Sequence, residues 1–565
     1  MKLIKKRAGQ KFNLDNYEKT YKGFAWDDYV SELEFFRKHK INAAYNAIDR
    51  HVKTSRKNKI ALYYEGDDGT KQKFTFLELA TLSNKSANLL RKKGVDRGGR
   101  VFIFLPRIPE LYISFLGILK VGAIAGTLFS AFQEQALYDR LSNSGAKVLI
   151  TNTELGERVK KIKHKLPNLK HIILVAKEEY QKEHASMEET THITELSPHD
   201  PVFMLYTSGT TGKPKGVVHR HMAILQEHLT AKWVLDLKDS DIYWCTADPG
   251  WVTGIAYGIL GSWSNGATSV VFSGRFDPAL WYKILQDYRV TVWYTAPTAV
   301  RMLMAQGTAL VKKYDLSNLR HLASVGEPLN PEAVVWGEKA FGLPFHDTWW
   351  QTETGAMCIV NYPCMDIKPG SMGKPFPGIL AGVIDDKGKE LPPMQEGNLA
   401  LKKGWPSMMK TIWRRPTKYK SYFIGDWYIS GDRAYKDKDG YFWFVGRADD
   451  VIKTSGERVG PFEVESALVE HPSVIEAGVI GKPDEIRGEI IKAFVVLKKG
   501  VKESEKLKEE LGLFVKKHLA GHAYPREVEF IDKLPKTRSG KIMRRVLKAK
   551  ELGLPIGDTS TLEEY

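Results

Sequence analysis

The sequence has few cysteines and no long uninterrupted apolar segment. Its three cysteines, in a chain of 565 residues, form no CxxC pair. This scarcity argues against a disulfide framework and a cysteine-based zinc site, and it fits a reducing compartment. The most apolar stretch, residues 111–129, is interrupted by Lys120, so a buried helix followed by a strand is expected there rather than a membrane span. Because no apolar run of signal-peptide length follows the basic N-terminus, we expect a soluble, cytoplasmic protein without a membrane partner.

Several signatures of other protein classes are also missing. Neither the HExxH pattern of zinc hydrolases nor the GxSxG pattern of serine hydrolases occurs. Lys and Arg number 84 against 67 Asp and Glu, a formal net charge of +17, but no DNA- or RNA-binding motif accompanies the excess. We therefore expect no nucleic-acid partner. The charge is interpreted as a solvated surface that also attracts small anions.

Short apolar runs alternate with amphipathic stretches over most of the chain. The 24 Tyr, 24 Phe and 14 Trp are typical of a well-packed globular protein. The alternation predicts an α/β fold with largely buried sheets. The predicted strands cover residues 101–105, 147–151, 171–175, 202–206, 242–246, 269–272 and 290–294, and the predicted helices include 76–93, 134–143 and 278–287.

The pattern of the sequence changes after Gly446, and the chain is too long for a single core. We place a boundary near Asp449, between a large multi-subdomain N-terminal α/β region, residues 1–448, and a small α+β C-terminal domain, residues 449–565. In the second part we expect helices at 461–470 and 504–518 and strands at 477–480, 492–497 and 527–531.

The densest motif follows the predicted strand 202–206 directly and reads YTSGTTGKPKG from residue 206 to residue 216. Small residues let backbone N–H groups approach phosphate oxygens, hydroxyl groups add donors, and lysines add positive charge. A glycine turn between a strand and a helix is the alternative, but a turn needs neither the hydroxyls nor the lysines. Thr207 and Pro214 stand where a Walker A loop needs Gly and Ser or Thr, so a P-loop NTPase is excluded.

Further motifs follow this loop in a fixed order: GEP at 326–328, WWQTETG at 349–355, SGD at 430–432, GRADD at 446–450, SGER at 455–458 and PKTRSGK at 535–541. Together they resemble the adenylate-forming superfamily of acyl-CoA synthetases, peptide-synthetase adenylation domains and luciferases. The strings WWQTETG, WVTG at 251–254 and PKTRSGKIMRR are similar in particular to the acetate-activating members. The motifs span residues 206–545.

The resemblance implies ligation of acetate to coenzyme A in two half-reactions. Acetate and ATP would give acetyl-adenylate and pyrophosphate, and CoA would then give acetyl-CoA and AMP. This chemistry needs cations, hydroxyl groups and Mg²⁺ more than a nucleophilic side chain. Propionate or another short-chain acid, or loading of a carrier protein, are alternatives, although no carrier domain is recognisable. A binding protein built on an inactive synthetase is opposed by the intact Glu353, Asp432 and Lys541.

The resemblance also implies binding roles for individual residues. The β- and γ-phosphates of ATP would be held by Thr207, Ser208, Gly209, Thr210, Thr211, Gly212, Lys213 and Lys215. The remainder of ATP would be contacted by Gly326, Glu327, Pro328, Asp347, Thr348, Trp349, Trp350, Gln351, Thr352, Asp432, Arg447 and Arg458. Glu353 would hold Mg²⁺. The acyl pocket would be lined by Trp251, Val252, Thr253, Val325 and Trp350, and the Trp350 indole would restrict it to a methyl group.

The resemblance also implies a catalytic role for Lys541 and a hinge role for Asp449. The Lys541 ammonium group would reach the acetate and the α-phosphate together, and a lysine acetyltransferase and a deacetylase would act on it. A surface lysine in a basic tail is the alternative. Asp449 would be the hinge about which the mobile C-terminal domain turns after adenylation, bringing residues 455–458 to the site.

CoA and a further metal ion complete the expected sites. Thr253, Ser455 and Gly456 would contact CoA. The arginine pair that holds the CoA nucleotide in the family has no clean match, so the candidates are Arg158, Lys160 and either Lys516 or Lys517. His471, with the backbone carbonyls of Val469 and Val474, matches a family metal position, but a lone surface histidine is the alternative that we favour.

Overall fold

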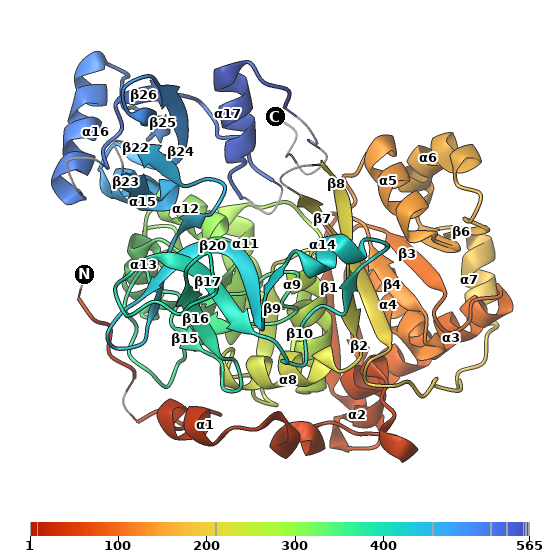
Figure 1. The fold of residues 1–565 in the computed structure, drawn as a ribbon. Helices are drawn as coiled ribbons and strands as arrows, with labels where there is room; N and C mark the ends of the chain where they lie inside the picture. The colour runs from red at the N-terminus through yellow and green to blue at the C-terminus, as the bar shows by residue number, and fades with distance from the viewer. Residues whose placement is uncertain are drawn as a thin grey trace.

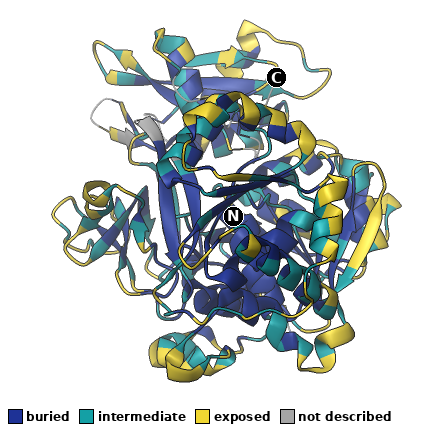
Figure 2. Cartoon of the chain, turned by 90° about the vertical axis from the view of Figure 1, so that its right-hand side faces the viewer, coloured by how far each residue is buried: buried dark blue, intermediate teal, exposed yellow. Residues whose placement is uncertain are grey.

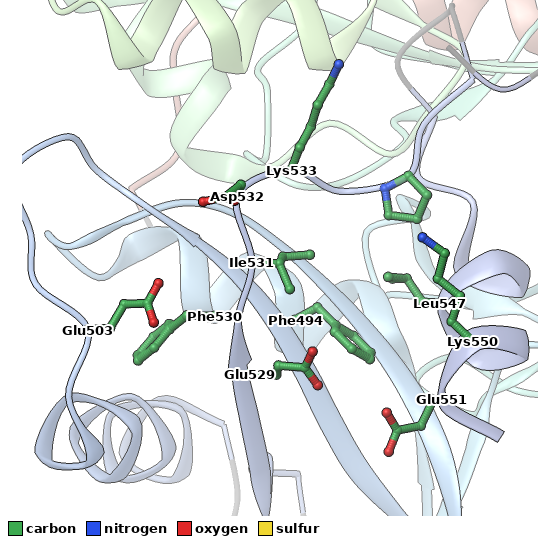
Figure 3. A pocket seen from close by; sticks show the side chains of 11 residues that line it. Phe494, Glu503, Glu529, Phe530, Ile531, Asp532, Lys533, Leu547, Lys550 and Glu551 are labelled. Carbon is green, nitrogen blue, oxygen red and sulfur yellow. The ribbon is translucent and has the colours of Figure 1, made fainter. Parts of the chain in front are cut away.

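The chain folds into a large N-terminal α/β domain and a small α+β C-terminal domain that lies on top of it (Figure 1). The computed structural model describes residues 2–7, 9–209, 212–454, 457–519, 523–537, 541–556, 559 and 562, without the side chains of residues 208–209, 212–213 and 458. Buried residues gather in the sheets and in the helices between them, and exposed residues cover the outer loops (Figure 2). The expected fold class is thus confirmed.

Three sheets build the described part of the N-terminal domain. The first has the strand order β18 (Thr411–Ile412), β8 (Gly212–Arg220), β7 (Pro201–Gly209), β4 (Ile124–Thr127), β3 (Arg100–Phe104), β5 (Val148–Thr151) and β6 (His171–Leu174). The second has the order β15 (Lys374–Pro375), β14 (Ile359–Val360), β13 (Phe345–Trp349), β12 (His321–Val325), β11 (Val292–Thr295), β9 (Ile242–Cys245), β10 (Thr268–Phe272), β1 (Ile60–Glu65) and β2 (Lys71–Thr75). The third has the order β16 (Ala381–Ile384), β17 (Gly397–Lys402), β20 (Trp427–Lys436) and β19 (Phe423–Ile424), with β21 (Phe442–Arg447) on β20.

Helices pack between and around these sheets, and local signals fix where several of them begin. The carboxylate of Asp277 accepts the Leu280 N–H at 2.8 Å, and Pro278 occupies the first turn, so the helix starts where the sequence predicts. The helices are α1 (Tyr17–Gly23), α2 (Arg50–Val52), α3 (Phe76–Lys92), α4 (Pro109–Val121), α5 (Glu134–Ser144), α6 (Thr153–Ile162), α7 (Glu178–Ala185), α8 (Ala223–Trp233), α9 (Val252–Ile255), α10 (Gly261–Ser264), α11 (Pro278–Asp287), α12 (Pro297–Ala305), α13 (Pro331–Phe341) and α14 (Pro416–Lys420).

The apolar stretch 111–129 forms the buried helix α4 and strand β4, as expected. Lys120 is fully buried in α4, and its ammonium group donates to Asp49 Oδ1 and Asn84 Oδ1, both at 2.8 Å. A buried ammonium group needs such partners, because without them its desolvation would oppose folding. No helix in the described part of the chain is both long enough and apolar enough to cross a membrane.

The phosphate motif lies on a β-hairpin. Strand β7 pairs with β8 in antiparallel register, and Thr207 lies opposite Lys215. The alternative, a glycine turn between a strand and a helix, is therefore wrong about the element that follows: that element is a strand and not a helix. The cross-strand ladder with β7 fixes this conformation, and nothing in the lysine- and proline-containing sequence predicts it.

The C-terminal domain is a sheet covered by helices. Its described strands run in the order β23 (Glu457–Val459), β22 (Ile452–Thr454), β25 (Gly488–Leu497) and β24 (Val474–Asp484), with β26 (Glu527–Phe530) parallel to β25. The helices are α15 (Pro461–Glu470), α16 (Glu505–His518) and α17 (Arg544–Leu552). The elements expected here are all present, and Asp449 lies in the connection between β21 and β22.

Candidate active site

A cleft of about 1850 Å³ separates the two domains. On the N-terminal side it is lined by residues at the carboxyl ends of β9, β11, β12 and β13, where ligands of open α/β sheets commonly bind. On the other side it is lined by residues of β24 and of the segment that precedes α17, among them Lys541. Most residues singled out in the sequence thus face one cavity.

The described part of the phosphate motif contributes Thr207 and Lys215 to the cleft wall. The Thr207 hydroxyl is buried and has no hydrogen-bond partner among the described residues. A buried unpartnered hydroxyl is costly, so this group is available for a ligand. Thr210 and Thr211 lie outside the described residues, as do the side chains of residues 208–209 and 212–213.

Glu353 forms a compact cluster with Lys215 and Tyr422. The Lys215 ammonium group lies 3.0 Å from Glu353 Oε1, and the Tyr422 hydroxyl donates to the same oxygen at 3.0 Å. Burial alone would raise the pKa of Glu353, but Lys215 outweighs it and the pKa is lowered. The carboxylate is therefore ionised, as a hard-cation ligand must be.

Asp432 is the centre of the most completely bonded cluster in the cleft. Its Oδ2 accepts from Trp349 Nε1 at 2.9 Å and Gln351 Nε2 at 3.0 Å, and its Oδ1 accepts from Arg447 Nη1 at 2.8 Å. Gly431 has a φ of 77°, and a Cβ there would meet Arg447 Nη2 at 3.1 Å, so glycine allows the guanidinium group to reach the carboxylate. The cluster presents a fixed anionic acceptor beside the 349–352 segment.

The GEP segment follows β12 and is held through Glu327. Thr298 Oγ1 donates to Glu327 Oε1 at 2.8 Å, and Arg301 Nη2 donates to Oε2 at 2.7 Å. Gly326, with a φ of 98°, and Pro328 line the cleft with them. Asp347 is also part of the wall, and burial raises its pKa to about 7.

The expected acyl-pocket residues are all part of the cleft wall. Trp251, Val252, Thr253, Val325 and Trp350 all line it. The absence of a side chain at Gly254 lets helix α9 pack closely against the backbone of residue 248, because a Cβ on Gly254 would lie only 2.5 Å from that backbone. Trp350 is 8% exposed, so its indole forms a wall of the cavity and not a free surface.

Lys541 lies in the cleft opposite the Asp432 cluster. Its backbone N–H donates to Thr537 Oγ1 at 3.1 Å, while its side chain is exposed to the space of the cleft. The pKa of Lys541 is lowered, first because the surrounding protein desolvates its ammonium group and then because of the positive charge of Arg447. The negative charges of Asp432 and Asp450 partly oppose this by raising the pKa. The ammonium group therefore lies within electrostatic reach of the carboxylate that the ribose is expected to use.

Other predicted site residues are not brought together. Arg158 donates to the Ser130 and Phe132 carbonyls, and Lys160 pairs with Glu157 on α6. Lys516 lies on α16, on the opposite side of the molecule from α6 (Figure 1). Ser455 and Gly456, and the side chain of Arg458, fall outside the described residues.

The alternative of a surface histidine at position 471 is wrong. His471 is 6% exposed, its ring packs edge-on against Phe514 at 5.0 Å, and Nε2 lies 3.2 Å from Glu510 Oε1. Among the described residues no group of three or more His, Cys, Asp or Glu side chains could hold a metal ion. A role for Val469 and Val474 stays a prediction.

Sequence reasoning missed several residues that organise the cleft. Tyr422, Thr298 and Arg301 stand outside every motif, and only the fold places them beside Glu353 and Glu327. Lys536 and Glu476 form a buried ion pair at 2.5 Å in the cleft wall that carries Lys541. The position of Lys536 inside the PKTRSGK motif was the available signal for this last pair.

The sequence profile of the AMP-binding enzymes matches residues 48–413, and that of the AMP-binding enzyme C-terminal domain matches residues 463–541. The chain therefore belongs to the AMP-binding enzyme family, and the expected place among adenylate-forming enzymes is confirmed.

Within this family the chain is similar to several acetyl-coenzyme A synthetases and to other CoA ligases of known structure. The acetyl-coenzyme A synthetase of Bacillus subtilis (strain 168) is 59% identical over 562 residues, which cover 98% of each chain. That of Methanothrix thermoacetophila is 45% identical over 93% of this chain and 85% of its own. Among solved structures, a Brucella canis acyl-CoA synthetase has a TM-score of 0.75 at 35% identity, covering 96% of this chain and 99% of its own. An anthranilate CoA ligase in complex with anthranoyl-AMP has a TM-score of 0.86 at 31% identity, covering 94% and 99%.

Proposed function

We propose that this enzyme is an AMP-forming acetate–CoA ligase. The observation that carries the proposal is the convergence of Thr207, Lys215, Asp432 and Lys541 on one cleft whose inner wall is Trp350. The relatives named acetyl-coenzyme A synthetase support acetate as the acid.

In the first half-reaction an acetate oxygen attacks the α-phosphorus of ATP, and the bond to the β-phosphate oxygen breaks. The products are acetyl-adenylate and pyrophosphate. Negative charge crowds at the α-phosphate, so a fixed set of donors and cations lowers the barrier without reorganising. We assign Lys541 to the acetate and α-phosphate, Asp432 and Arg447 to the ribose, and Lys215 with the Thr207 hydroxyl to the terminal phosphates.

Glu353 fits the role of a Mg²⁺ ligand. Its carboxylate is held ionised beside Lys215, and Mg²⁺ is usually bound by one or two carboxylates together with substrate phosphates. When bound there, the ion would neutralise charge on the phosphates. Lys215 holds this carboxylate in place, and its own charge adds to that neutralisation.

Trp350 sets the acyl size in this proposal. Its buried indole lines the same cleft as Val252, Thr253 and Val325, and in this proposal it restricts the acyl pocket to a methyl group. One methylene group in an apolar pocket changes binding by about 1–3 kcal/mol, so propionate should be a slow substrate. Trp350→Gly should shift preference toward longer acids, and an unchanged acetate-to-hexanoate ratio would remove the role.

In the second half-reaction the CoA thiol attacks the acetyl carbon, AMP leaves, and the thiol proton goes to solvent. We propose a boundary at residue 449 and rotation of residues 449–565 about Asp449, which withdraws Lys541 and brings residues 455–458 to the active site, where Ser455 and Gly456 would contact CoA. Thr253 would face the pantetheine end. Arg158, Lys160 and Lys516 stay candidates for its nucleotide.

A cytoplasmic location and control by acetylation belong to the same proposal. Cys245, Cys358 and Cys364 are all free, which suits a reducing compartment. The Lys541 side chain faces the space of the cleft, and we propose that an acetyltransferase and a deacetylase act on it.

The test is pyrophosphate release with acids of two to eight carbons, with and without CoA. Acetate-driven release, followed by CoA-dependent AMP formation, is the expected result. Preference for propionate would support the short-chain alternative. AMP release that ignores CoA would overturn the ligase assignment in favour of carrier loading.

A further inference from the structure

Two buried tyrosines enclose the Trp350 indole from the side that faces away from the cleft. Tyr294 comes from β11, and Tyr257 comes from the short helical segment Ala256–Leu260. Both are 0% exposed, and neither lines the cleft. They therefore cannot contact a substrate there directly.

Tyr294 holds the edge of the indole through a chain of hydrogen bonds in which the donor and the acceptor of each bond are fixed. Trp350 Nε1 donates to the Tyr294 hydroxyl at 3.2 Å. The Tyr294 hydroxyl lies 2.7 Å from Thr348 Oγ1, and Thr348 Oγ1 donates its single proton to the Ser324 carbonyl at 2.7 Å. Tyr294 must therefore donate to Thr348 and accept from Trp350, so both functions of its hydroxyl are used.

Tyr257 holds the indole on a second side. Its ring meets the Trp350 ring edge-on, with centroids 5.1 Å apart and planes at 81°. Its hydroxyl accepts from the Met357 N–H at 2.8 Å and lies 2.8 Å from Thr230 Oγ1, which itself donates to the Gln226 carbonyl at 2.6 Å. The Tyr257 hydroxyl therefore donates to Thr230, and this ring is as fixed as that of Tyr294.

We infer that Tyr294 and Tyr257 are positioning residues that fix the Trp350 indole and thereby set the depth of the acyl pocket. The inference rests on the proposed function, because it names what limits the acid in that same pocket. A tryptophan beside an open cleft has other rotamers available. Two hydrogen-bond chains, in which the indole N–H and all four hydroxyl groups have partners, exclude those rotamers more strictly than apolar packing alone.

The Tyr294 chain also joins two binding regions. Thr348 belongs to the 347–352 segment that is expected to contact the nucleotide, and Trp350 closes the acyl pocket two residues later. The Tyr294 hydroxyl binds both side chains, so a shift of the indole is opposed by the strand that supports the nucleotide site.

The test compares tyrosine-to-phenylalanine variants by pyrophosphate release with acetate and with butyrate. Tyr294→Phe leaves the indole N–H without its acceptor, and the butyrate-to-acetate ratio of kcat/KM should rise about 2- to 10-fold, the equivalent of one lost hydrogen bond. Tyr257→Phe keeps the ring contact and should give a smaller rise. Tyr282→Phe is the matched control, because Tyr282 is equally buried in α11 and its hydroxyl has no described hydrogen-bond partner; its ratio should not change.

A double-mutant cycle separates positioning from a general loss of stability. In a Trp350→Gly background there is no indole to hold, so adding Tyr294→Phe should leave the acid ratio unchanged even if the melting temperature falls. An equal rise in both backgrounds, or no rise with Tyr294→Phe in the parent enzyme, would overturn the inference. Failure of the parent enzyme to release pyrophosphate with acetate would instead overturn the proposed function, so the two failures are distinguishable.

Discussion

The two walls of the cleft are built in opposite ways. On the N-terminal wall the functional side chains hold one another: Asp432 accepts from three side chains, and Glu353 is paired with Lys215 and Tyr422. On the C-terminal wall the Lys541 ammonium group forms no hydrogen bond or ion pair with a residue that the structure describes. One wall is therefore organised before a ligand arrives, whereas the other supplies a cation that, in the proposed function, is withdrawn after adenylation.

The segment that carries Lys541 is nevertheless anchored at both ends. Lys536 pairs with Glu476 on β24 at 2.5 Å, and Arg544 pairs with Glu465 on α15 at 2.5 Å. The backbone is fixed to the C-terminal domain, while the ammonium group has no hydrogen-bond or ion-pair partner among the described residues. Such an arrangement suits a group that must move with its domain and still find a defined position when the domain returns.

The largest effect is expected from removing the charge at Lys541. Lys541→Gln, or acetylation of Lys541, should slow acetyl-adenylate formation about 100- to 1000-fold, the usual loss when one group that stabilises charge in a transition state is removed. Thioester formation from supplied acetyl-adenylate should change less than about twofold. Lys550→Gln, an exposed lysine of α17 outside the cleft, is the control for both rates. Adenylation at the unmodified rate would show that the two walls do not cooperate as described.

The next largest effect is expected at Asp449, the proposed hinge. Asp449→Pro fixes φ and should slow thioester formation about 100-fold while leaving adenylation nearly unchanged, because a second arrangement disfavoured by roughly 2.7 kcal/mol is populated 100-fold less. The Ala448 and Asp450 N–H groups donate to Gly431 and Arg447 carbonyls, whereas the N–H of Asp449 has no described backbone acceptor, so proline removes no described backbone hydrogen bond. Asp449→Ala is the control, because it removes the 3.7 Å pair of the Asp449 carboxylate with Arg447 Nε without fixing φ. Single-turnover measurement of each half-reaction checks this, and equal losses in both would argue against a hinge.

On the organised wall, Asp432→Asn should raise the KM for ATP about 10- to 100-fold. The substitution keeps the shape but leaves Arg447 without its anionic partner, and hydrogen bonds to charged groups contribute about 1.5–3 kcal/mol. Asp426→Asn, at an exposed side chain in the neighbouring turn, serves as the control. A KM that stays within twofold would mean that the bonded cluster supports the fold and not the nucleotide.

The same contrast explains what the sequence could and could not predict. Helices α11 and α15 begin and end where expected, because Pro and capping residues mark them locally. The motif residues of the N-terminal wall could be predicted because they lie in short contiguous segments whose residue types indicate their chemistry. Tyr422 and Arg301 were missed because their partners lie 69 and 26 positions away in the chain, so only tertiary packing reveals them. The burial of His471 against Phe514 was missed for the same reason.

The smallest expected effect concerns the contact between the two domains outside the cleft. Glu332 on α13 faces Glu470 on α15, and burial, followed by the neighbouring Glu470 carboxylate, raises the pKa of Glu332 to about 8. A raised pKa means that this domain arrangement disfavours the ionised carboxylate. The arrangement is therefore fully stable below the ordinary pKa of 4.5 and weakens as the pH rises toward 8.

Glu332→Gln should remove this weakening, because the amide carries no charge at any pH in the range. Relative to the parent enzyme, the ratio of adenylation to thioester formation at pH 8.5 should rise about two- to fivefold, and the rise should shrink as the pH falls toward 4.5, where the Glu332 carboxyl group becomes protonated in both domain arrangements. Glu338→Gln, an exposed position on the same helix, is the matched control. If Glu332→Gln and Glu338→Gln gave the same pH profile, the domain contact would not influence the choice between the two half-reactions, and withdrawal of Lys541 would depend on the hinge alone.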